Sequence, residues 1–417
     1  MTAATVSADS SIPGAKRILV VLSLINLFNY LDRYVLSAVL EPIKTELQIT
    51  DDGDMGRLAT AFMLGYFLTS PIFGYLGDRL PRKYLMALGV IGWSLGTCLT
   101  GYAQAFAFMV FCRVLVGLGE ASFGAIGPAV ISDAYSKEKR NGAMTIFYLA
   151  VPLGAAFGFV LGGMIAAKMG WRHAFYWTGL PGFLLAALLL IVPEPKRGQS
   201  DAADAAEGSK KVSLADIKSF AYNKQYLLAV AGYVFYTFAM GAFSFWGPTF
   251  LTRVHHLDTE KASGFFGPTL VVGGVFGTLL GGRLATAWQK KSPAGYARLL
   301  YLSVALAIPF SFFAFLTSDA TTAMVSMAIA LIFLFLSTGP INTVLVEAVP
   351  VNTRASAMAI SIFLIHALGD LWSPELVGRT ADAFENLRYG MLILPSAFIL
   401  ATLFWAWLAR VQGGKKA

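Results

Sequence analysis

Long apolar stretches, separated by short polar or Gly- and Pro-containing breaks, follow one another along almost the whole chain. Each is about 20 residues long, the length of an α-helix that crosses the hydrocarbon core of a bilayer. The pattern therefore predicts twelve membrane-spanning helices. Their expected ranges are 18–40, 55–77, 84–102, 105–132, 142–167, 172–192, 226–250, 262–287, 293–316, 320–349, 355–378 and 388–410.

One polar segment is much longer than the other breaks and is rich in Ala, Asp, Lys, Ser and Gly. Such a composition is typical of a linker, and it falls after the sixth expected helix. We therefore predict a six-helix bundle over residues 1–193, a cytoplasmic linker over 194–225 and a second six-helix bundle over 226–417.

The composition agrees with a membrane protein. Of 417 residues, 56% are hydrophobic and only 13% are charged, and the mean hydropathy is +0.64. Soluble domains are about half apolar and about a quarter charged. The two cysteines, Cys98 and Cys112, have no His or Cys neighbour at metal-ligand spacing, so we expect no metal site and no cofactor.

Basic residues are concentrated in the segments that would share one side of the membrane with both termini and the linker. Because loops rich in Lys and Arg stay in the cytoplasm, we predict a multi-pass protein of the cell (inner) membrane with both termini cytoplasmic. The net charge of +8 then reflects topology, and no nucleic-acid partner is implied. We expect a monomer in contact with the lipid bilayer.

An internal repeat relates the two halves. The fourth span ends in DAYSKEKRNGAM, residues 133–144, and the tenth span ends in EAVPVNTRASAM, residues 347–358. In both, an acidic residue precedes an Arg by seven positions, and a small residue, Ala and Met follow. The offset of six spans indicates a duplicated bundle.

The segment GYLGDRLPRK, residues 74–83, resembles the signature G-x-L-x-D-R-x-G-R-K of the major facilitator superfamily, with Pro81 in place of the usual Gly. The resemblance implies an all-α membrane protein whose twelve helices form two pseudo-symmetric six-helix bundles. In that architecture the substrate site lies between the bundles near the middle of the membrane.

Three further stretches narrow the resemblance. NYLDRYVLS (29–37), GLGEASFGAIGP (117–128) and HALGDLWSPELVGRTAD (366–382) together resemble the spinster-like lipid transporters. NYLDR alone is shared with organic anion and cation symporters of the same superfamily. The spinster-like resemblance implies an amphiphilic substrate such as a lysolipid or a sphingolipid-like phosphate.

Four charged residues stand within apolar spans of the first half: Asp32, Arg33, Arg113 and Glu120. A charge at mid-membrane costs about 2.5–3.5 kcal/mol on insertion scales, so such residues usually face a cavity or a partner. Asp32 and Arg33 are adjacent and point about 100° apart on a helix. We expect Arg33 at the central cavity and Asp32 beside the fourth span, near Arg113 or Glu120.

Two explanations of this cluster compete. A static ion cluster could hold two helices together, but buried pairs offset their desolvation poorly. The functional hypothesis is a proton relay. A carboxyl in a low-dielectric cavity keeps its proton, whereas a nearby Arg favours its charged form, so a change of partners can load or release a proton. The spinster-like resemblance implies that this Asp, Arg and Glu set serves coupling and substrate handling. We predict proton coupling by Asp32, Arg113 and Glu120, and substrate binding by Arg33, Asn29 and Glu120.

The second half offers one ionisable pair and many aromatic residues. His366 and Asp370, four residues apart on the eleventh span, are candidates for substrate binding, although a lone His on an apolar helix more often packs against its neighbours. Further candidates for the substrate site are Tyr236, Phe243 and Trp246 on the seventh span, although such residues more often pack against neighbours or lipid. If they line the cavity, charges in the first half would bind a head group and aromatic walls in the second would bind a tail.

Charges at the cytoplasmic ends of the spans are expected to form a gate. The signature segment carries Asp78, Arg79 and Arg82, and we place Asp78 near the N-terminal end of the eleventh span, where the helix dipole favours an anion. The repeat predicts two matching latches, Asp133 with Arg140 and Glu347 with Arg354.

Other functions fit less well. The chain has no HExxH motif and no pattern of intramembrane hydrolase residues, so we expect no enzyme. It also lacks a filter-like loop of the kind that channels use. A proton-coupled symporter of small organic anions is the main alternative, and a drug exporter is the third.

Overall fold

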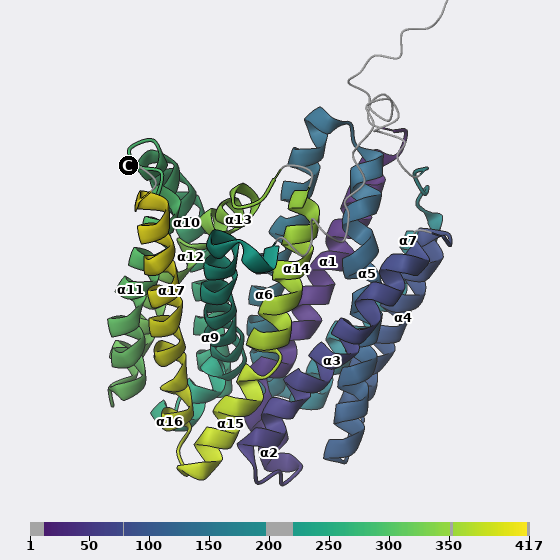
Figure 1. Ribbon diagram of the computed structural model, residues 1–417. Helices are drawn as coiled ribbons and strands as arrows, with labels where there is room; N and C mark the ends of the chain where they lie inside the picture. The colour runs from purple at the N-terminus through teal and green to yellow at the C-terminus, as the bar shows by residue number, and fades with distance from the viewer. Residues whose placement is uncertain (1–11, 78, 197–219, 351–352, 415–417) are drawn as a thin grey trace, which may run out of the picture. The chain divides into compact units, whose positions relative to one another are not determined.

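The computed structural model describes residues 12–77, 79–196, 220–350 and 353–414. These residues form helices and connecting turns, without a β-strand among them. The helices, labelled in Figure 1, are α1 (Ala15–Ala38), α2 (Leu40–Glu46), α3 (Asp52–Gly77), α4 (Arg82–Gly101), α5 (Phe106–Ala134), α6 (Lys137–Met169), α7 (Trp171–Ile191), η1 (Phe220–Tyr222), α9 (Lys224–His255), α10 (Thr259–Gln289), α11 (Gly295–Leu316), α12 (Ala320–Phe335), α13 (Thr338–Glu347), α14 (Arg354–Ile365), η3 (His366–Asp370), α15 (Ser373–Ala383), α16 (Leu387–Met391) and α17 (Ile393–Gly413).

The described residues contain 12 helical segments long and apolar enough to cross a membrane. The predicted number of spans and the predicted fold class are confirmed. Their ends lie within a few residues of those expected from the sequence, except that the seventh span continues to His255 and the eleventh to Ala383.

The eleventh span is not one regular helix. Between α14 and α15 the chain makes a π-helical turn, η3, in which the amide of Leu371 donates to the carbonyl of His366 at 3.1 Å. Pro374 has no amide hydrogen to continue the α-helical ladder, and it stands near the start of the restarted helix α15. Such π turns are frequent at functional sites, and this one holds His366 and Asp370.

Contacts divide the chain into two compact units. Unit 1 contains α1, α2, α4–α7 and α3 from Ala61 onward. Unit 2 contains Gln48–Thr60, which includes the first turns of α3, and the helices from η1 to α17. The predicted domain boundaries flank residues 197–219, which lie outside the described residues, and they stay a prediction.

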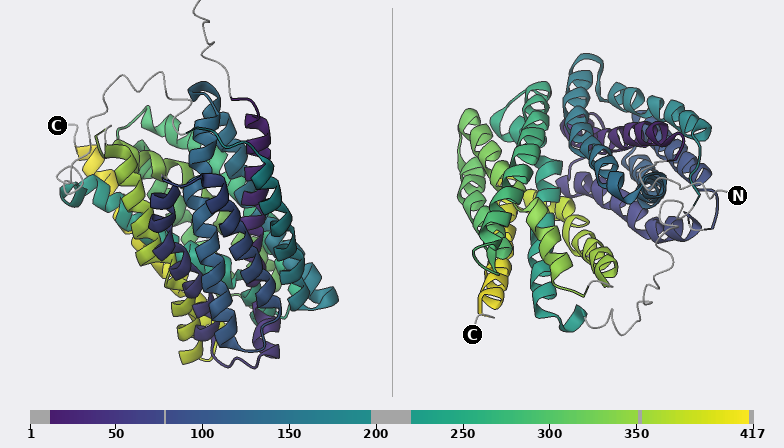
Figure 2. Two further views of the ribbon diagram at one scale, coloured as in Figure 1. Left: turned by 90° about the vertical axis from the view of Figure 1, so that its right-hand side faces the viewer. Right: turned by 90° about the horizontal axis from the view of Figure 1, so that it is seen from above.

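Within unit 1, α1 packs along α6, and α4 contacts both α5 and α7 (Figure 2). Glycines allow these close approaches. A Cβ atom on Gly158 of α6 would lie 2.6 Å from the carbonyl oxygen of Leu31 in α1. A Cβ atom on Gly89 of α4 would lie 2.6 Å from the carbonyl oxygen of Gly119 in α5. Because lipid is as apolar as the helix surfaces, no hydrophobic effect drives these helices together, and close van der Waals contact between their backbones is a main source of helix association.

We expect Gly89→Ala to lower the thermal stability of the detergent-purified protein. Its added methyl group would collide with Ser122 and with the backbone of α5, and overpacking of this kind costs about 1–3 kcal/mol. Gly92→Ala, on the same helix, is the matched control, because its Cβ would meet nothing within 4 Å among the described residues. Equal melting temperatures for the two variants would contradict the tight packing of α4 on α5.

Candidate functional site

The four intramembrane charges of the first half lie together in unit 1. The guanidinium of Arg33 on α1 donates to Oε2 of Glu120 on α5, from Nη2 at 2.5 Å and from Nε at 3.2 Å. The Glu120 side chain is fully buried, whereas 26% of the Arg33 side chain is exposed. Arg33 is thus the member of the pair that an incoming molecule can reach.

Asp32 points away from Arg33, as adjacent positions on a helix require. It is 1% exposed, and its Oδ2 accepts a hydrogen bond from the hydroxyl of Thr97 on α4 at 3.3 Å. The charges of Glu120 and Arg113 both act on it. Asn29, one helical turn before Arg33 and also buried, has its amide near the Glu120 carboxylate. Glu120 therefore lies within electrostatic reach of both Asp32 and Arg33.

Aromatic rings surround the arginines. The Arg33 guanidinium carbon lies 4.8 Å from the ring centres of Tyr30 and Phe62 and 5.6 Å from that of Tyr66. The guanidinium carbon of Arg113, which is 3% exposed, lies 4.9 Å from the Phe62 ring centre. These distances allow cation–π attraction, which is strongest where water is excluded.

The cluster is incompletely satisfied. Asp32 Oδ1, Glu120 Oε1 and Arg113 Nε are buried and have no hydrogen-bond partner among the described residues. A buried polar atom without a partner costs about 1–3 kcal/mol, so a static ion cluster would be a poor way to join helices. Because these atoms have no partner while others of the same groups are hydrogen-bonded, the charged groups can exchange partners.

His366 and Asp370, the ionisable pair predicted in the second half, are in contact in unit 2. His366 Nδ1 lies 2.9 Å from Oδ1 of Asp370 across the π turn η3. Gly241 makes room for this turn, since a Cβ atom there would lie 2.4 Å from the Cβ of Asp370. The His366 side chain is 35% exposed, so a polar molecule can reach it.

The three aromatic candidates of the seventh span are buried in unit 2. The hydroxyl of Tyr236 donates to the carbonyl of Leu334 at 3.0 Å, and the indole nitrogen of Trp246 donates to that of Pro374 at 2.8 Å. Phe243 packs against other rings. In this structure the three residues hold α9 against its neighbours, and their contact with substrate stays a prediction.

The predicted gate residues of the first half are placed in part. Arg82 Nη1 donates to Asp133 Oδ2 at 2.5 Å, and the Arg82 amide donates to Glu194 at 2.8 Å. Arg79 is exposed, with its guanidinium over the ring of Tyr75. The structure thus joins Arg82 to Asp133 inside unit 1, a pairing that the repeat did not suggest.

The remaining predicted gate contacts involve residues that the structure describes only in part. Asp78 and the side chain of Arg354 lie outside the described residues. Arg140 lies on α6 and Glu347 ends α13, where it is exposed. The pairings of Asp133 with Arg140 and of Glu347 with Arg354 stay predictions.

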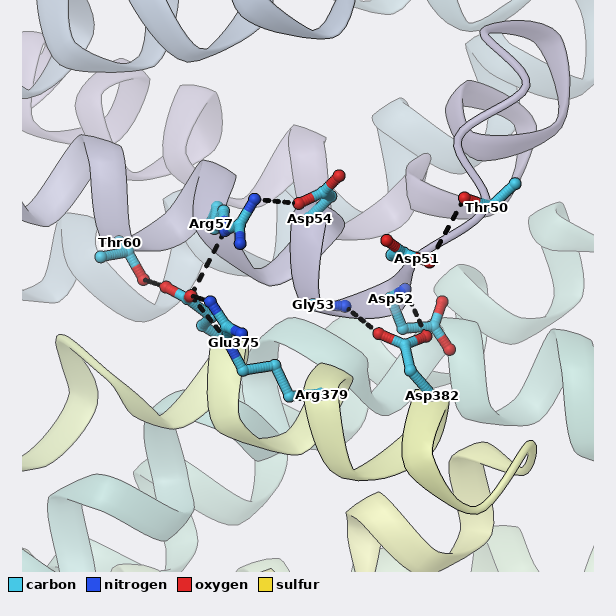
Figure 3. A network of polar contacts seen from close by, with 10 residues as sticks. All are labelled: Thr50, Asp51, Asp52, Gly53, Asp54, Arg57, Thr60, Glu375, Arg379 and Asp382. Carbon is cyan, nitrogen blue, oxygen red and sulfur yellow. Dashed lines mark hydrogen bonds and ion pairs between the residues drawn. The ribbon is translucent and has the colours of Figure 1, made fainter.

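Sequence reasoning missed a polar cluster in unit 2, at the N-terminal end of α3, which Figure 3 shows. The carboxylate of Asp382 on α15 accepts hydrogen bonds from the amides of Asp52 and Gly53, at 2.6 and 2.7 Å. It thereby caps a helix from another segment, where the dipole favours a negative charge. Arg253 at the end of α9 donates to Asp52 Oδ2 at 2.5 Å.

Glu375 forms the second half of this cluster. Its carboxylate accepts from Arg379 Nη2 at 2.6 Å, from Arg57 Nε at 3.4 Å and from the Thr60 hydroxyl at 3.3 Å (Figure 3). Gly56 lets the backbones meet, because a Cβ atom there would lie 2.4 Å from the Cα of Glu375. The stretch DDGDMGR, with acids in the first helical turn and two glycines three residues apart, was the signal that could have indicated this contact.

Comparison with known proteins gives the same architecture. Residues 22–374 match the Major Facilitator Superfamily. The chain is 31% identical to "Protein spinster homolog 1" of Xenopus tropicalis, covering 95% of this chain and 79% of that protein. It is 30% identical to "Sphingosine-1-phosphate transporter SPNS2" of Danio rerio, covering 92% and 82%.

A relative from Arabidopsis thaliana, "Probable sphingolipid transporter spinster homolog 1", is 30% identical, with 93% of this chain and 87% of that protein covered. Among solved structures, a bacterial homologue of the human lysosomal transporter spinster, described as inward-facing and unoccupied, superposes with a TM-score of 0.88. That pair is 25% identical and covers 97% of this chain and 99% of the other.

We expect Asp382→Ala to loosen the first turn of α3. The amides of Asp52 and Gly53 would lose a charged acceptor, which costs about 1–3 kcal/mol and corresponds to hydrogen exchange about 5- to 150-fold faster at residues 52–56. Asp319→Ala is the control, since Asp319 caps its own helix α12 through the Thr322 amide. Unchanged exchange at residues 52–56 in Asp382→Ala would contradict the capping role.

Proposed function

The chain belongs to the Major Facilitator Superfamily and to its spinster-like branch, and from this premise we propose a proton-coupled transporter that moves an amphiphilic lysolipid or sphingolipid-like substrate by alternating access. It is a multi-pass membrane transporter and not an enzyme. The observation that carries the proposal is the buried ion pair between Arg33 and Glu120, with Asp32 and Arg113 beside it.

The substrate class rests on the chemistry of Arg33 and on the relatives. A partly exposed guanidinium can donate two parallel hydrogen bonds to a phosphate, which makes it a suitable group for an anionic head. Tyr30 and Tyr66 flank it and offer apolar faces next to the charge. Relatives described as sphingosine-1-phosphate and sphingolipid transporters handle molecules of this kind.

Proton coupling would arise because the Glu120 carboxylate and the anionic head of the substrate compete for Arg33. While Glu120 is ionised, it holds the guanidinium through two hydrogen bonds. Protonation removes the negative charge, weakens that pair and releases Arg33 for the anionic head of the substrate. Asp32, which has one open oxygen and interacts with Glu120, is the second carboxylate through which a proton can pass.

Alternating access would use the polar contacts at the ends of the helices as gates. The cluster of Asp52, Arg57 and Thr60 with Glu375 and Asp382 is one such set, because its ion pairs and capping bonds can break and re-form. The residues Asp78, Arg79, Arg82, Asp133, Arg140, Glu347 and Arg354 are proposed for the opposite end. The distribution of Lys and Arg favours cytoplasmic termini in the cell (inner) membrane, and we propose a monomer.

The test is uptake by purified protein in proteoliposomes with an imposed pH gradient. We expect uptake of a labelled lysolipid or sphingosine-1-phosphate and no uptake of a small aromatic acid. Uptake of the aromatic acid alone would favour the organic-anion symporter and overturn the lipid assignment.

We expect Glu120→Gln to abolish proton-driven uptake and to leave substrate binding measurable, because an amide cannot take up a proton at this position. Loss of roughly 100-fold or more is expected for a group that carries the coupled proton. Glu46→Gln is the control, since Glu46 interacts with Arg172 at an exposed position, where ion pairs contribute little. Full uphill transport by Glu120→Gln would remove Glu120 from the coupling role.

A further inference from the structure

Phe62 contacts two positive charges at once. Its ring centre lies 4.8 Å from the guanidinium carbon of Arg33 and 4.9 Å from that of Arg113. The side chain is 3% exposed and comes from α3, whereas the arginines come from α1 and α5. A single buried ring therefore connects three helices of unit 1 through the charges of the candidate site.

The backbone fixes where this ring lies. A Cβ atom on Gly117 of α5 would lie 2.1 Å from the carbonyl oxygen of Phe62 and 2.9 Å from the amide nitrogen of Tyr66. A Cβ atom on Gly65 of α3 would lie 2.5 Å from the carbonyl oxygen of Val114. The backbones of α3 and α5 thus touch at Phe62 and again within the next helical turn, so Phe62 is held in register with Arg113 and Glu120.

The two arginines have different partners. Arg33 forms the ion pair with Glu120, whereas Nε of the buried Arg113 has no hydrogen-bond partner among the described residues. Their positive charges also act on one another. The electron-rich face of a ring compensates part of such repulsion and attracts a guanidinium without forming a hydrogen bond with it. Phe62 can therefore hold Arg113 close to Glu120 while Arg33 occupies the carboxylate.

We propose that Phe62 is a positioning residue that keeps Arg33 paired with Glu120 and holds Arg113 close to that carboxylate. When Arg33 turns to the substrate head group, Arg113 then forms the ion pair with Glu120. The proposal rests on the proposed function and deepens it. It assigns the two arginines an order: Arg33 leaves first because it is the exposed one, and Arg113 stays buried.

The position of Phe62 on α3 adds a route from the gate to the charges. Two residues earlier, the hydroxyl of Thr60 donates to the carbonyl of Leu371 at 3.1 Å, in unit 2. Movement of α3 on loss of these contacts would carry α5 with it, because the two backbones are packed together, and would shift the ring and Arg113 relative to Arg33 on α1. Opening of the gate and release of the arginines would then be coupled.

The experiment compares Phe62→Leu, which removes the ring face, with Phe62→Tyr, which keeps it, in reconstituted protein. The matched control is Phe123→Leu, since Phe123 is also buried in unit 1 but packs against the rings of Trp93 and Phe147. If Phe62→Leu does not yield monodisperse protein, Phe62→Met replaces it.

We expect Phe62→Leu to lower proton-driven uptake about tenfold or more, because the ring face that positions both guanidiniums is lost, while Phe62→Tyr stays within about threefold of the wild type. Without the ring, Arg113 joins Arg33 on Glu120. A second cation favours the charged carboxylate, so half-maximal uptake should move to lower pH by about one unit. The charged and titratable groups that face Glu120 are Asp32, Arg33, Arg113 and Tyr66.

Wild-type rate and pH profile in Phe62→Leu, or an equal loss in Phe123→Leu, would overturn the assignment of Phe62 while the proposed function stands. Absence of lipid uptake by the wild type would overturn the proposed function instead. The role of Phe62 is then tested without transport. The thermal stabilities of Phe62→Leu, Arg113→Gln and the double variant are measured and compared in a double-mutant cycle. Coupling between the two positions supports the contact, and additive effects refute it.

Discussion

The buried ion pair between Arg33 and Glu120 is the interaction on which the rest of the site depends. In lipid surroundings an isolated charge is expensive, so each charged group must find a partner on another helix. This requirement brings α1 and α5 together at mid-span and places Asp32 against α4 and Arg113 against α3. The charged cluster therefore joins side chains from several helices at one place.

Helix α3 is the element that takes part in both units. Its first turns are bound by α15 through Asp382 and Glu375, and its middle packs on α5 by direct backbone contact at Gly65 and Gly117. Polar contacts hold the first segment, together with the buried Met55 and Leu58, whereas the middle packs backbone against backbone. One continuous helix thus connects the polar contacts with α15 to the packing around the charged cluster.

The two units contain different kinds of candidate residue. Unit 1 contributes the charged cluster and its surrounding rings. In unit 2 the aromatic residues predicted to meet a lipid tail are engaged in packing, and the accessible polar pair is His366 with Asp370 on the π turn. The likeness to spinster proteins covers both units.

The sequence alone was sufficient for the number of spans, the fold class and the family, because a bilayer requires apolar runs of fixed length and because the motifs are local in the chain. It also indicated Asp32, Arg33, Arg113 and Glu120, since a charge in an apolar run is visible without coordinates. Partners are not local: the pairing of Arg82 with Asp133, the capping of α3 by Asp382 and the position of Phe62 between two arginines each join residues dozens to hundreds of positions apart. Only the packing of helices decided them, because backbone contact at particular glycines sets which side chains can meet.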